Sequence, residues 1–189
     1  MQKYFFMRPL LEMLASASFL RWLVAKTLRV AAALIVLFSL VAFFYAGKVI
    51  FELPPSGMLG GILFQACFIV AIYAVVHASF IRAQDIDNIG AHVQTIFPML
   101  TLLLKLAGEA MSVFIALVAV GGGVYVWFTG RNVATILNPM PVFLPAFGDT
   151  TFMGGIEFMV GGVLIAIVLL LVFYALSEIT ELLARSAKP

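Results

Sequence analysis

The sequence predicts an all-α, polytopic integral membrane protein: a four-transmembrane-helix bundle with an N-terminal amphipathic interfacial helix. Of its 189 residues, 64% are hydrophobic and only 11% are charged, and the mean hydropathy is +1.16. A soluble domain of this length could not hide so much apolar surface from water. In addition, four stretches carry no charged side chain, and each is near the roughly 20 residues that a helix needs to cross a bilayer. These stretches are Val30–Gly47, Met58–Ile81, Ala110–Gly130 and Phe158–Ser177.

An N-terminal arm, residues 1–28, precedes the first apolar stretch. Along the arm, large apolar residues such as Trp22 are interleaved with basic residues such as Arg21. This pattern is typical of a helix that lies in the headgroup plane, and a cytoplasmic segment packed against the bundle is the alternative. We therefore divide the chain into this arm and a transmembrane domain, residues 29–187. The spans are expected near residues 30–50, 58–81, 101–129 and 153–177.

The connections between the spans carry their own signals. Two adjacent prolines and a glycine predict a tight turn at residues 51–57, and a polar loop is expected over Arg82–Gln94. The third helix is expected to begin near Thr95, with Pro98 in its first turn, where proline is tolerated. The external loop at residues 131–151 is unusually apolar. We expect it to lie against the membrane, dip into it, or contact a partner protein.

The basic residues are unevenly distributed between the two sides of the predicted bundle. Nine of the eleven lie on the side of the N-terminus: Lys3, Arg8, Arg21, Lys26, Arg29, Arg82, Lys105, Arg185 and Lys188. Only Lys48 and Arg131 lie on the other side. Because cytoplasmic loops are enriched in Lys and Arg, we expect both termini in the cytoplasm. The predicted location is a plasma membrane, specifically the cytoplasmic (inner) membrane of a bacterium.

Two carboxylates fall within the predicted spans, where a charged group is costly and is a candidate for function. Glu109 lies about two turns into the third span and Glu157 about one turn into the fourth, so we expect them in opposite leaflets. Lys105 is one turn from Glu109 and is expected to pair with it, and His77 stands at a similar depth. The sequence leaves two interpretations of Glu109 open. It either fixes the packing of the helices or serves as a protonatable site in an ion path.

Small residues recur beside both carboxylates at spacings of three or four, which place them on one face of a helix. Such faces let another membrane helix approach closely. The predicted packing face comprises Gly108, Ser112, Ala116, Ala119, Gly123, Gly154 and Gly161. The glycine-rich run at 153–162 is expected to pack near the outer leaflet, against Gly121–Gly123 of the third span.

Residues for cofactor or metal chemistry are sparse. The chain has two histidines, His77 and His92, and one cysteine, Cys67. The two histidines straddle the expected end of a span, so they are poorly placed to ligate one haem, and the set is too small for a self-contained zinc or iron–sulfur site. Phosphate-binding and hydrolase motifs are missing. We expect no cofactor, no bound metal and no enzymatic activity. We also expect no nucleic-acid partner, since topology explains the basic residues.

The favoured functional hypothesis is a non-catalytic subunit or scaffold of a larger membrane complex. It would pack through its small-residue faces and its apolar external loop against other membrane subunits or copies of itself, within the lipid bilayer. The alternative is a small oligomeric ion channel, or a proton- or ion-coupled transporter that uses an intramembrane carboxylate. A membrane-embedded enzyme is the weakest of the three hypotheses.

Overall fold

The computed structural model describes residues 17–90, 96–133 and 150–186. Four long helices make up almost all of this part of the chain: α2 (Ala17–Phe51), α3 (Pro55–Asp87), α4 (Ile96–Thr129) and α6 (Phe152–Ser186). Each helix has 33 to 35 residues and is apolar enough to cross a membrane. At 1.5 Å per residue such helices are about 50 Å long, so they exceed roughly 30 Å of hydrocarbon. The predicted all-α bundle of four membrane-spanning helices is confirmed.

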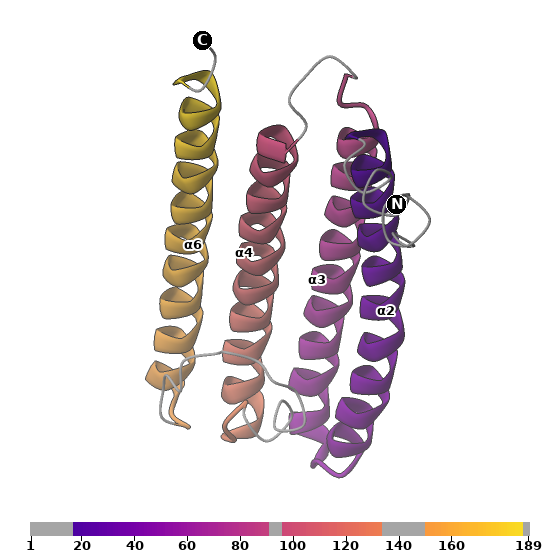
Figure 1. Cartoon of the computed structure of the whole chain (residues 1–189). Helices are drawn as coiled ribbons and strands as arrows, with labels where there is room; N and C mark the ends of the chain where they lie inside the picture. The colour runs from indigo at the N-terminus through magenta and orange to yellow at the C-terminus, as the bar shows by residue number, and fades with distance from the viewer. Residues whose placement is uncertain (1–16, 91–95, 134–149, 187–189) are drawn as a thin grey trace, which may run out of the picture.

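The bundle is open, because its helices stand in a single row (Figure 1). Successive helices are antiparallel, and extensive packing among the described residues joins α2 to α3, α3 to α4, and α4 to α6. Within the most apolar 18-residue segment of each helix, half of the α4 residues are buried. In α2 and in α6 only 11% of these residues are buried. The two outer helices are therefore the edges of the row, and most of their surface faces the surroundings.

The turn between α2 and α3 is tight, as the sequence predicted. Pro55 is the first residue of α3, a position where the missing backbone N–H is not needed. Gly57 follows in the first turn of α3 and donates its N–H to the Pro54 carbonyl at 2.8 Å. The short connection fixes α2 and α3 as antiparallel neighbours.

Two glycines near the start of α3 allow it to approach both of its neighbours. A Cβ atom on Gly61 would lie 2.6 Å from Ile50 of α2, and one on Gly60 would lie 2.5 Å from Phe128 of α4. Neither distance leaves room for a side chain, so glycine at these positions allows the close contact. This end of the row also holds the larger apolar core. Its most buried members are Ile50, Phe64, Val118, Ala119, Tyr125 and Val133.

A second, smaller core lies at the opposite end of the row, where α2 begins and α3 ends. It contains Ala25, Ala83, Ile86 and Met99. This core explains two differences from the sequence prediction. Residues 17–28 are part of one continuous helix, α2, and do not form a separate element. The helix α3 continues to Asp87, although a loop was expected from Arg82, because burial of its last turns stabilises the helix beyond the hydrocarbon.

One further prediction agrees with the structure, and two others concern residues outside the described ranges. The helix α4 begins at Ile96 with Pro98 in its first turn, which agrees with the expected start near Thr95. The first 16 residues of the predicted interfacial arm lie outside the described residues. The same holds for residues 134–149, which make up most of the predicted apolar loop.

Candidate functional site

A polar junction joins three helices of the row: Arg82 of α3, Glu109 of α4 and Tyr174 of α6. Arg82 donates through Nε to Glu109 Oε2 at 3.1 Å and through Nη2 to Glu109 Oε1, so the guanidinium holds both carboxylate oxygens. The hydroxyl of Tyr174 donates to the same Oε1 atom at 2.7 Å. Paired N–H donors on one carboxylate give a strong and directional contact. Glu109 thus links three of the four helices.

The junction is partly shielded from solvent. The side chains of Arg82 and Glu109 are 20% and 23% exposed. A second carboxylate, Asp85, accepts from Arg82 Nη1 at 3.1 Å, one turn further along α3. Lys105 lies one turn from Glu109, and its ammonium is 5.9 Å from the centre of the Tyr174 ring. Two cations and two carboxylates therefore meet here, and their formal charges cancel.

The position of the junction follows from the charge-free stretches. Arg82 comes directly after the stretch that ends at Ile81, and Glu109 comes directly before the one that begins at Ala110. Glu109 was expected about two turns inside the third span. Because α4 begins at Ile96, Glu109 lies 13 residues, or about 20 Å, into the helix. The junction therefore joins the charged ends of two charge-free stretches.

The same end of the row carries an ion pair between α2 and α3. Arg29 Nη2 donates to Asp87 Oδ2 at 2.5 Å, and the two side chains are 42% and 35% exposed. Arg21, two turns earlier on α2, donates to the carbonyl of Ile89. Polar contacts between consecutive helices thus cross the whole row near this end.

The predicted site residues fall into two groups. Lys105 and Glu109 both lie at the junction, but Glu109 pairs with Arg82, where a Lys105–Glu109 pair had been expected. His77 does not join them: its ring is exposed and stacks on Tyr73, with 5.7 Å between ring centres and an interplanar angle of 10°. His77 is five residues before Arg82, so its side chain projects from a different side of α3.

Glu157 is also placed differently from the prediction. Its side chain is exposed, while the surface of α6 that meets α4 is formed by Gly155, Phe158 and Gly162. Glu157 and Tyr174 are 17 residues apart on α6, which corresponds to about 26 Å. Glu157 is therefore far from Glu109, as expected from their predicted leaflets, and it does not lie on the glycine face.

The predicted packing face lies mainly within the chain. Among its seven residues, five are buried and two, Ala116 and Gly161, are partly buried. A Cβ on Gly108 would lie 2.7 Å from the Phe173 side chain, and one on Gly123 would lie 2.6 Å from the Gly155 carbonyl oxygen. These contacts all join α4 to α6. The small residues therefore allow α4 and α6 of the same chain to pack closely. On α6 the residues that contact α4 are Gly155 and Gly162, one residue after the predicted Gly154 and Gly161.

A further polar contact was not predicted. Gln65 lies about a third of the way along α3, and its side-chain amide donates to the Phe43 carbonyl of α2 at 3.0 Å. Gly47 makes room for it, since a Cβ there would lie 3.3 Å from the Gln65 nitrogen. An amide in an otherwise apolar span is a recognisable signal, because polar side chains hydrogen-bond across membrane helices. Tyr174 and Arg82 were missed for a different reason, since their partner Glu109 is distant in sequence.

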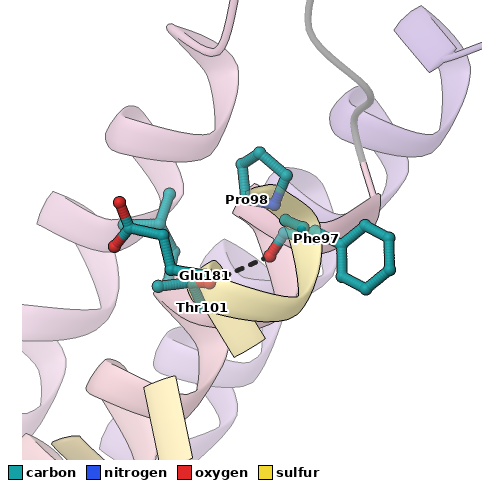
Figure 2. A pocket seen from close by; sticks show the side chains of 6 residues that line it. Phe97, Pro98, Thr101 and Glu181 are labelled. Atoms are coloured by element: carbon teal, nitrogen blue, oxygen red, sulfur yellow. Dashed lines mark hydrogen bonds between the residues drawn. The ribbon is translucent and has the colours of Figure 1, made fainter. Parts of the chain in front are cut away.

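A pocket of about 290 Å³ lies between α4 and α6 at the end of the row near the C-terminus of α6 (Figure 2). Its walls include Phe97, Pro98 and Leu102. Figure 2 shows the Thr101 hydroxyl turned toward the Phe97 carbonyl, to which it donates at 3.0 Å. Glu181 also borders the pocket, and it accepts from Arg185 at 2.8 Å. Both polar groups are thus engaged within their own helices, and they do not converge on the cavity.

The polar residues of the junction contact one another across three helices. Within the described residues, no group of three or more His, Cys, Asp or Glu side chains is placed to hold a metal ion. The junction contains two carboxylates, two cations and a phenol, and hydrogen bonds join Arg82, Glu109, Asp85 and Tyr174 to one another. No known protein family, curated protein or solved structure matches the chain.

Proposed function

We propose that this protein is a non-catalytic integral membrane subunit or scaffold that assembles with other membrane proteins or with copies of itself. The observation that carries the proposal is the single row of helices. A row has two faces and two edges but no interior, so one copy of the described helices does not enclose a path across the membrane. A polypeptide of this shape acts through the surfaces that it presents to its neighbours.

The state of Glu109 supports a structural role over transport. A carboxylate in an ion path must exchange its partners as ions or protons pass. Here both oxygens are held by Arg82, and one of them also by Tyr174. Releasing Glu109 would break contacts among three helices at once. The geometry of Glu109 therefore favours a role in which this residue fixes the positions of α3, α4 and α6 relative to one another.

The exposed polar residues indicate where partners bind. His77 is exposed although it belongs to a charge-free stretch, and Glu157 is exposed in the second turn of α6. Polar side chains that face hydrocarbon are costly, and protein contacts usually cover them. Because the small-residue faces are used inside the chain, we assign the partner contacts to the open faces of the row. The distribution of Lys and Arg supports placing both termini in the cytoplasm.

The direct test is the composition of the particle extracted into nanodiscs from its own membrane. We expect a particle of fixed stoichiometry that contains partner subunits or several copies. In liposomes, the purified chain should give no ion flux above protein-free controls. A monomeric particle, or a flux that Glu109→Gln abolishes, would contradict the proposal and favour the channel or transporter.

Cross-linking can locate the partner surface on the same particle. In a Cys67→Ser background, a cysteine replacing His77 should cross-link to the partner or second copy. The matched control replaces Val168, which is 57% exposed on the edge helix α6. Equal yields at the two positions would show that the His77 face is not the preferred contact.

A further inference from the structure

An apolar furrow of about 230 Å³ runs between α2 and α3 within their charge-free stretches. Val36, Ser39, Leu40 and Phe43 line it from α2, and Phe68, Ile69 and Ile72 line it from α3. Six of these seven side chains are bulky, and Ser39 is the small one. Membrane helices pack closely where their surfaces carry small residues, so the rims of this furrow are poorly suited to another helix. A flexible hydrocarbon chain fits such a surface better.

Cationic residues continue the same face of α2 toward the end of the row. The positions 22, 26, 29, 33, 36, 40 and 43 are three or four residues apart and share one side of the helix. Lys26 and Arg29 therefore stand in line with the furrow. Lys26 is exposed and makes no ion pair within the described residues, and Arg29 is 42% exposed beside Asp87. The furrow thus has a basic end and an apolar body.

The dimensions match one leaflet of a bilayer. Arg29 and Phe43 are 14 residues apart on α2, which corresponds to about 21 Å. Half of a bilayer, with its headgroup region included, is about 20–22 Å thick. A lipid whose headgroup lies at Arg29 is therefore long enough for an acyl chain to reach the furrow wall at Phe43. Arg29 also directly precedes the charge-free stretch, so it lies at headgroup level.

We propose that this furrow is a binding site for an anionic phospholipid of the surrounding bilayer. The phosphate group contacts Lys26 and Arg29, and one acyl chain lies against Leu40 and Ile72. The site is separate from the polar junction and does not depend on the proposed function. A Lys or Arg near a membrane surface favours anionic lipid by roughly fivefold each. Asp87 opposes the phosphate, so it limits the affinity of the site.

Quenching by brominated lipids tests the proposal. The reporter is Ala33→Trp, which lies on the same side of α2 without lining the furrow, in a chain whose Trp22 and Trp127 are replaced by phenylalanine. In nanodiscs of phosphatidylglycerol and phosphatidylcholine, the bromine label is placed on the acyl chains of one lipid or the other. We expect stronger quenching from labelled phosphatidylglycerol at equal mole fraction. Lys26→Gln should lower this preference by about fivefold, while Lys48→Gln, at the opposite end of α2, should leave it unchanged.

Asp87→Asn gives a result that structural damage would not produce. It removes the competing carboxylate from Arg29, so the preference for phosphatidylglycerol should rise. Native mass spectrometry of the unmodified protein should also show retained phosphatidylglycerol, which Leu40→Trp displaces by filling the furrow. Equal quenching by the two lipids would overturn the proposal. A preference that neither Lys26→Gln nor Asp87→Asn alters would overturn it as well.

Discussion

Replacing Glu109 with glutamine removes the carboxylate that joins α3, α4 and α6 and keeps a side chain of nearly the same size. The amide retains one oxygen for Tyr174, but it cannot accept two N–H bonds from Arg82 as an anion does. Arg82 keeps Asp85 as a counterion, so its charge is not left alone. The substitution should therefore weaken mainly the contact between α3 and α4.

The size of this effect follows from the burial of the pair. Breaking a fully buried ion pair costs about 3–5 kcal/mol, and an exposed pair contributes about 0–1 kcal/mol. Arg82 and Glu109 are 20% and 23% exposed, and Arg82 retains Asp85. We therefore expect Glu109→Gln to lower the free energy of unfolding by about 2 kcal/mol. Tyr174→Phe removes one hydrogen bond and should cost about 1 kcal/mol.

The assay is reversible unfolding in mixed micelles, with the mole fraction of denaturing detergent as the variable. Glu181→Gln is the matched control, because Glu181 is 51% exposed and pairs with Arg185 within α6. We expect the control to change the unfolding free energy by less than about 0.5 kcal/mol. If Glu109→Gln is no more destabilising than Glu181→Gln, the junction does not hold the helices together. A double-mutant cycle with Tyr174→Phe should show coupling, since both changes act on the same oxygen.

Two further changes test the contacts between neighbouring helices. Gly162→Val should destabilise the bundle by about 1–3 kcal/mol in the same assay, because a Cβ at this position meets Ala119 of α4. The control Ala175→Val lies on the exposed side of α6 and should leave the free energy of unfolding nearly unchanged. Gln65→Leu removes the donor to the Phe43 carbonyl and should cost about 0.6 kcal/mol. A larger change at Ala175 than at Gly162 would refute the assigned α6 face. An unaltered free energy of unfolding in Gln65→Leu would refute the role of Gln65.

The number and nature of the helices were predictable because they follow from hydropathy alone. Where the helices end was less predictable. Arg82 ends a charge-free stretch, so it was assigned to a loop, yet Ala83 and Ile86 are buried and the helix continues to Asp87. A charge marks the edge of the hydrocarbon, but it does not mark the end of a helix whose next turn packs on its neighbours.

The composition of the candidate site was predicted only in part. A charge within a predicted span identified Glu109, and spacings of three and four residues identified the small residues beside it. It did not identify which helix would meet them, because periodicity describes one helix at a time. Tyr174 is 65 residues from Glu109, and no local pattern links the two. On α6, each residue turns by about 100°, so Glu157, two residues after Gly155 and five before Gly162, points away from the side that faces α4.

The arrangement of helices in a row supports the proposed function, and one distance tests it directly. The spin labels are attached to Leu37→Cys of α2 and Val168→Cys of α6 in a Cys67→Ser background. Both positions are 57% exposed and lie near the middle of the two edge helices. Three spacings of about 8–10 Å separate the axes of these helices in a row. Double electron–electron resonance in nanodiscs should therefore give a mean distance of about 25 Å or more. A distance below about 15 Å would show that α2 and α6 are neighbours in a closed bundle and would contradict the account.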